Sequence, residues 1–215
     1  MMQDWSTATA SQMLWIVGAQ EHRYPSSTSM IAASVVKSAI DISIPLVHIF
    51  CDWPGKNEEK VIVNILYSMI RQLVDILPPK VETCSDFSTA RFGSLDGSFK
   101  TWDEALSICA ELFIEVPSPL LVVIDGIEHV GLGTSKKNIE GLLGVLNAHI
   151  SRVSEHDKSL KVFKVLFTTA GNCASLNRLG NKDLKIVKAS AKSARQSPGK
   201  FQPGKTELLL FNRMR

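Results

Sequence analysis

Short, mostly apolar runs alternate along this chain with longer segments in which apolar residues recur at the helical period. The apolar runs occupy residues 13–18, 44–51, 120–124, 161–169 and 184–187. The helical segments cover residues 30–40, 58–77, 101–113 and 139–153. An unbroken apolar run is typical of a strand buried on both faces, and strands that alternate with helices favour an α/β fold. The pattern predicts a parallel sheet with helices on both faces.

The run at residues 120–124 is the centre of this pattern, because it ends abruptly on Asp125 and Gly126. In open α/β sheets the ligand crevice lies outside the carboxyl ends of the strands, so Asp125 is expected there. Gly18 closes the first apolar run, and Thr168 stands at the end of the fourth. We therefore expect these three strand ends to face one crevice.

The segments between the strands differ in how clearly they predict structure. Residues 58–77 keep a helical period over five turns and end at two prolines. The serines and threonine of residues 26–29 precede the helix expected at 30–40 and are candidates for its N-cap. Residues 80–100 show no period and are predicted to form a long surface loop.

Composition and charge divide the chain into two parts. The hydrophobic content of 45% with 21% charged residues is typical of a globular domain, expected at residues 1–187. Residues 182–215 hold nine Lys and Arg against two acids, so residues 188–215 are expected to form a basic, flexible tail. The aromatic residues of this tail are Phe201 and Phe211, too few for base stacking, and nucleic acid is an unlikely partner.

Two further observations bear on where the protein works. No run of eighteen or more apolar residues occurs, so we expect no membrane span. The four cysteines form no Cys-x-x-Cys pair, and three of them lie in or beside apolar stretches. This spacing favours buried thiols in a reducing compartment over disulfides or zinc, and predicts a cytoplasmic protein.

The order of these segments resembles the NTPase domain of the STAND class of P-loop proteins. The likeness is to the NACHT-like, nephrocystin-3 N-terminal type found in many fungal signalling proteins. Residues 14–18 resemble the strand before the phosphate loop, and 47–52 the second strand. Residues 65–78 resemble a helix with a Gln-Leu pair, 121–130 the Walker B strand and 164–169 the sensor-1 strand. The resemblance implies a three-layer sandwich around a five-stranded parallel P-loop (ASCE-type) sheet of order 5-1-4-3-2.

The phosphate loop is where the chain departs most from this family. A working loop reads Gly-x-x-x-x-Gly-Lys-Ser/Thr, in which backbone amides cradle phosphate and the lysine neutralises its charge. Counted from Gly18, the last three of these positions hold Arg23, Tyr24 and Pro25. Arg23, together with the hydroxyls of Ser26 and Ser27, is then the candidate replacement for the missing groups.

The other two motifs are also altered. The family's Walker B pattern is close to Asp-Gly-Leu-Asp-Glu, whereas this chain has Asp125, Gly126, Ile127, Glu128 and His129 in succession. The resemblance makes Asp125 the candidate magnesium ligand and Glu128 and Thr168 further nucleotide-site residues. The sensor-1 arginine is missing, because residues 168–171 read Thr-Thr-Ala-Gly. We assign no catalytic residue.

These departures lead to two functional hypotheses. The first is a NACHT-like signalling or scaffolding module that binds protein partners and has lost, or strongly impaired, NTP hydrolysis. The second is a divergent switch that binds ATP or GTP with Mg²⁺ through a rebuilt phosphate loop. Family members carry helical and winged-helix segments after this core, so the resemblance also implies either a fragment of a longer protein or a remnant of the core alone.

Overall fold

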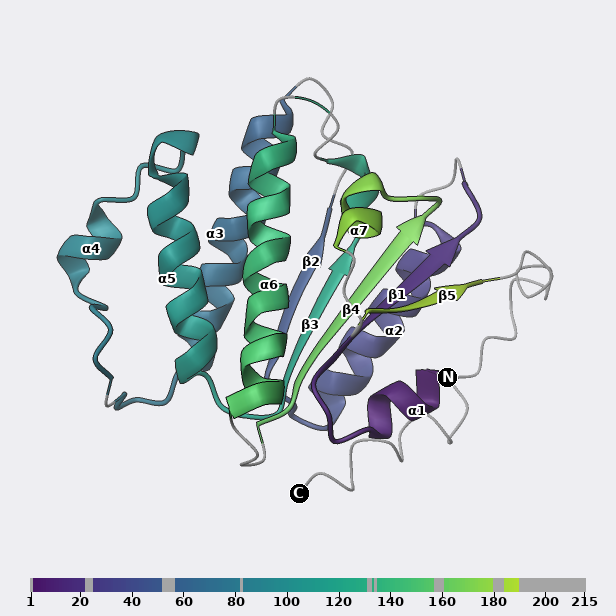
Figure 1. The fold of residues 1–215 in the computed structure, drawn as a ribbon, viewed down its shortest axis with the longest axis horizontal. Helices are drawn as coiled ribbons and strands as arrows, with labels where there is room; N and C mark the ends of the chain where they lie inside the picture. Colours follow the sequence, from purple (N-terminus) through teal and green to yellow (C-terminus); the bar gives the residue numbers. More distant parts are fainter. Residues whose placement is uncertain are drawn as a thin grey trace.

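The computed structural model describes residues 2–21, 25–51, 57–81, 83–130, 133, 135–156, 161–179 and 184–189. Within them, five strands form one all-parallel sheet in the order β2-β3-β4-β1-β5 (Figure 1). The strands are β1 (Gln12–Gly18), β2 (Leu46–Phe50), β3 (Leu120–Asp125), β4 (Phe163–Ala170) and β5 (Leu184–Lys188). The predicted α/β fold and strand order, 5-1-4-3-2 read from the other edge, are confirmed.

The helices are distributed unequally over the two faces of the sheet. The helical elements are α1 (Met2–Thr7), α2 (Ser27–Asp41), α3 (Glu58–Ile76), α4 (Thr89–Gly93), η1 (Phe99–Thr101), α5 (Trp102–Glu115), η2 (Ile127–His129), α6 (Lys136–His156) and α7 (Ala174–Arg178). Residues of α3, α5, α6 and α7 share one apolar core with β1 to β4. The opposite face carries a smaller core with α2 and Trp5 of α1, and α2 lies behind the sheet in Figure 1.

The alternation of side chains along each strand explains how one sheet serves two cores. Met13 and Trp15 point toward α3 and α6, whereas Leu14 and Ile16 point toward α2. All residues of β3 are buried, as the continuous apolar run predicts. The outer strands β2 and β5 are covered less completely.

Three short helices were not predicted from the sequence. α1, α4 and α7 contain five or six residues each, which is too short for a period of 3.6 residues to become visible. The expectation that residues 80–100 form a loop without regular structure is therefore wrong for Thr89–Gly93. Ser88 caps this helix by accepting a hydrogen bond from the backbone amide of Arg91.

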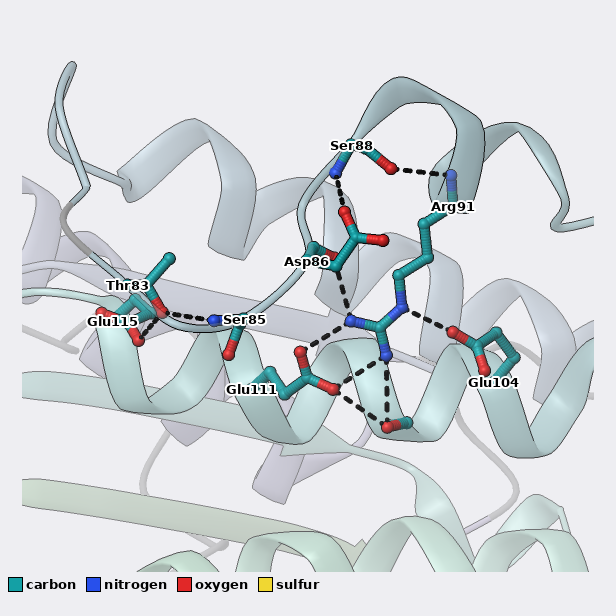
Figure 2. Close-up of polar contacts among 9 residues, drawn as sticks. Thr83, Ser85, Asp86, Ser88, Arg91, Glu104, Glu111 and Glu115 are labelled. Atoms are coloured by element: carbon teal, nitrogen blue, oxygen red, sulfur yellow. Dashed lines mark hydrogen bonds and ion pairs between the residues drawn. The ribbon is translucent and has the colours of Figure 1, made fainter.

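Arg91 fastens α4 to α5 (Figure 2). Its guanidinium donates to Glu104 Oε1 at 2.6 Å and makes two hydrogen bonds to the carboxylate of Glu111, at 2.7 and 2.8 Å. It also donates to the backbone carbonyl of Asp86 at 2.9 Å. The guanidinium lowers the pKa of the Glu111 carboxyl below its ordinary value. One arginine thus ties the segment before α5 to the helix surface.

We expect Arg91→Met to lower the free energy of unfolding by about 2 kcal/mol, because two partly buried carboxylates lose their shared cation. Lys37→Met is the matched control, since it breaks the exposed pair of Lys37 with Asp41, which is worth roughly 0.5 kcal/mol or less. Urea denaturation at pH 7 measures both variants. Equal effects of the two substitutions would contradict a special role for Arg91.

Part of the sequence prediction lies outside the described residues. This applies to Arg23 and to the basic tail from residue 190 onward. Among the helices that the structure describes, none is both long and apolar enough to cross a membrane.

Candidate functional site

The carboxyl ends of β3, β4 and β1 lie side by side, as the sequence predicts. Asp125 is the register partner of Thr168, and Gly18 is the register partner of Ala170. Thr168 Oγ1 donates a hydrogen bond to Asp125 Oδ1 at 2.5 Å, and both residues are buried, Asp125 with 2% of its surface exposed. The candidate metal ligand is therefore held by a hydroxyl from the neighbouring strand.

Gly126 turns the chain sharply after Asp125. Its φ of 77° and ψ of 17° are left-handed, a conformation that glycine adopts without steric cost. Its amide donates to the carbonyl of Thr168 at 2.9 Å, and the amide of Cys51 donates to the carbonyl of Asp125 at 2.8 Å. This turn leads directly into η2, which carries Glu128.

Glu128 links η2 to the end of β4. Its Oε1 accepts a hydrogen bond from the amide of Ala170 at 2.6 Å. Its Oε2 is buried and has no hydrogen-bond partner among the described residues. Burial raises the pKa of this carboxyl above its ordinary value, and His129 Nε2 lies 3.7 Å from Oε1. Glu128 can therefore hold a proton more readily than an exposed glutamate.

The first turn of α2 approaches the end of β1 closely. A Cβ atom at Gly18 would lie 2.7 Å from Thr28 Cγ2, so only glycine fits without a shift at this position. Ser26 caps the helix: its Oγ accepts from the amide of Ser29 at 3.0 Å. The same Oγ lies 2.9 Å from the hydroxyls of both Thr28 and Ser29. The N-cap predicted among residues 26–29 is confirmed at Ser26.

A carboxylate of the chain itself contacts the start of α2. Glu21 Oε2 accepts a hydrogen bond from the backbone amide of Ser27 at 3.2 Å. The amides at a helix N-terminus favour anions, because they point outward unpaired and lie at the positive end of the helix dipole. Glu21 is thus an internal anion at the end of the helix that follows β1.

The predicted site residues therefore fall into two groups on one edge of the sheet. Asp125, Thr168 and Glu128 are joined through β3, η2 and β4, whereas Gly18, Ser26 and Ser27 lie around the first turn of α2.

Sequence reasoning missed four contacts at this edge. Glu21 is a lone acid in a loop, with no pattern to indicate where it points. Trp15 Nε1 donates to Thr169 Oγ1 at 2.8 Å, and Thr169 Oγ1 donates to the carbonyl of Gly171 at 2.7 Å, which joins β1 to the end of β4. The amide of Ala170 has no sequence signal, because any residue carries one.

Comparison with known proteins places this chain in a family. No curated protein matches the chain. The model of the Nephrocystin 3, N-terminal family matches residues 1–169, which is well over half of the 215 residues. The match includes β1 to β3 and β4 up to Thr169, and so contains Gly18, Asp125 and Thr168. The chain belongs to the Nephrocystin 3, N-terminal family, a NACHT-related family of proteins.

Proposed function

We propose that this protein is a NACHT-like module that signals or scaffolds through protein partners and has lost, or strongly impaired, NTP hydrolysis. The observation that carries the proposal is the hydrogen bond from the amide of Ser27 to the carboxylate of Glu21. In a P-loop domain the helix after the first strand presents its N-terminal amides to phosphate. Here a carboxylate of the protein lies at that place and repels a second anion.

The groups that would hold magnesium and triphosphate support the same proposal. No lysine stands in the register of the phosphate loop, where Arg23, Tyr24 and Pro25 follow one another. Oδ1 of the buried Asp125 is already engaged by the hydroxyl of Thr168. Magnesium in nucleotide sites is usually held by one or two carboxylates together with phosphates and water. The engaged Oδ1 of Asp125 therefore weakens the metal side of such a site, and the missing lysine weakens its phosphate side.

We place the protein in the cytoplasm. Cys84, Cys109 and Cys173 are free thiols, and Cys51, Cys109 and Cys173 are buried. Burial raises the pKa of the Cys109 thiol to about 12, so this thiol stays protonated and unreactive. Free thiols are typical of proteins in a reducing compartment.

A second candidate function is a divergent nucleotide-binding switch. Ser26, Thr28 and Ser29 place three hydroxyls within one turn at the N-terminus of α2. With Asp125 and Thr168 on the same edge of the sheet, these hydroxyls are the groups from which a rebuilt ATP or GTP site with Mg²⁺ would be made.

Calorimetric titration with ATP and ADP, with and without Mg²⁺, separates the two functions. We expect no binding to the wild-type chain up to millimolar nucleotide, and no magnesium-dependent hydrolysis. Micromolar binding that Asp125→Ala abolishes would establish the switch instead. Hydrolysis abolished by the same substitution would refute the proposed loss of NTPase activity.

The Glu21→Ala variant tests the observation behind the proposal. Removing the carboxylate frees the amide of Ser27, and we expect affinity for inorganic phosphate or ATP to rise roughly tenfold or more. Glu59→Ala is the matched control, because it removes the same charge from an exposed position in the first turn of α3. If both variants bind phosphate equally, Glu21 has no specific role at the helix end.

A further inference from the structure

Within the part of the chain that the structure describes, Gln72 of α3 hydrogen-bonds to the outer edge of β2. Among the described strands, β2 pairs with β3 alone, and the backbone amides of Leu46, His48 and Phe50 point away from β3. Gln72, on α3, makes two hydrogen bonds to this open edge. The amide of His48 donates to Gln72 Oε1 at 2.9 Å, and Gln72 Nε2 donates to the carbonyl of His48 at 3.0 Å.

These two hydrogen bonds reproduce what a neighbouring strand would offer. A residue in a paired strand presents one donor and one acceptor side by side, and the amide of Gln72 presents the same pair to His48. Gln72 Nε2 also donates to the carbonyl of Ser68 at 3.3 Å, so the side chain is anchored on its own helix. Gln72 thus occupies the position of a sixth strand at the middle of β2.

The two edges of the sheet are protected in different ways. Open strand edges invite pairing with other chains, and natural proteins protect them with lysines, prolines or a covering segment. β5, at one edge, carries Lys185 and Lys188. β2 reads Leu-Val-His-Ile-Phe, without lysine or proline inside the strand, and its residues favour β-structure. The lysines of β5 protect its edge from pairing with other chains. β2 has no such charges, so a residue outside the strand must protect its edge.

We propose that Gln72 prevents the edge of β2 from pairing with β2 of a second copy of this chain. His48 is the central residue of the strand, so a two-fold axis beside it would pair Leu46 of one copy with Phe50 of the other. The strand carries no acidic or Lys/Arg side chain that would repel its own copy. Gln72 hydrogen-bonds to the amide and carbonyl of His48, the backbone groups nearest that axis. The side chain of Gln72 would therefore have to move before two β2 strands could pair.

The test compares the mass of the wild-type chain with that of Gln72→Leu over a range of concentrations by sedimentation velocity. Leucine has a similar size but cannot bond the backbone of His48, and we expect the association constant to rise at least about tenfold. Asn64→Leu is the matched control, because it adds the same side chain at an exposed position of α3 and leaves Gln72 in place. Circular dichroism establishes that each variant is folded, and Gln72→Ala replaces Gln72→Leu if the latter unfolds.

Two further measurements locate the contact. Hydrogen exchange of the associated variant should show increased protection at residues 46–50. The double variant Q72L/H48K should return to the mass of the wild type, since lysines facing each other across the axis repel. His48 Nδ1 has no hydrogen-bond partner among the described residues, so the substitution removes no bond there. A folded Gln72→Leu variant with wild-type mass, or association without protection at residues 46–50, would overturn the proposal.

Discussion

Replacing Gly126 with alanine is expected to lower the free energy of unfolding by about 3 kcal/mol, the larger part of it from a backbone clash. The φ of 77° at this residue is unfavourable for any residue with a Cβ atom. A Cβ atom here would also lie 2.8 Å from the carbonyl oxygen of Cys51, which the hydrogen-bonded end of β2 holds in place. The turn that positions Asp125 and Glu128 would therefore have to shift.

Gly93→Ala is the control for this substitution. A Cβ atom at Gly93 would meet no atom within 4 Å, and Gly93 is the last residue of α4. The expected effect is neutral, or stabilising by up to about 1 kcal/mol, because alanine restricts the unfolded chain. Urea denaturation of both variants gives the comparison. If Gly126→Ala is no less stable than Gly93→Ala, the turn after β3 does not need a left-handed residue.

Lys164 is expected to make the stability of the protein depend on pH in the alkaline range. Its side chain points toward the α2 face of the sheet and is 3% exposed. Its Nζ donates to the carbonyl of Ala10 at 2.6 Å and lies 5.7 Å from the centre of the Trp5 ring. Burial, and then the charge of Lys185, lower the pKa of Lys164 from 10.5 to about 8.

The direction in which stability changes with pH follows from the protonation of Lys164 in the folded and the unfolded chain. Below pH 8 the lysine is protonated in both states, and the full cost of burying its charge is present. Between pH 8 and 10.5 the folded state releases the proton while the unfolded state keeps it, so stability rises with pH. The total rise is on the order of 3 kcal/mol, and above pH 10.5 it levels off.

Lys164→Met should remove this rise and leave the protein more stable at pH 7 than the wild type. Lys161→Met is the matched control, because Lys161 also donates to a backbone carbonyl, that of Ile114, but is exposed. Denaturation curves collected from pH 7 to 10.5 measure the slope for each chain. A wild-type slope that survives in Lys164→Met would show that another group releases the proton.

The proposed function and the proposed role of Gln72 concern different parts of the same sheet. Glu21 concerns the carboxyl ends of the strands, where an anion would bind at α2. Gln72 concerns the side of the outermost strand, which is remote from Gly18 because β3 and β4 lie between β2 and β1. Failure of one proposal therefore leaves the other intact.

The main elements of the fold can be predicted from the sequence because they follow a period. The apolar run at 120–124 becomes β3, and the helical spacing of residues 58–77 becomes α3. A strand that is buried on both faces must be apolar throughout. In a helix with one buried face, apolar residues must recur every three to four positions. The sequence also predicts that Asp125 and Thr168 lie close together, because each ends a strand and the carboxyl ends of parallel strands meet at one edge of the sheet.

The contacts that distinguish this protein depend on single polar residues and on tertiary structure. Glu21 at the amide of Ser27, Gln72 on the backbone of His48, and Arg91 between Glu104 and Glu111 follow no period. A lone polar side chain carries no signal of its partner, because the partner is chosen by how separate elements pack. The pattern of apolar and polar residues in the sequence determined which segments become strands and helices. Only the packing of these elements in the tertiary structure determined which backbone groups are hydrogen-bonded by side chains and which are not.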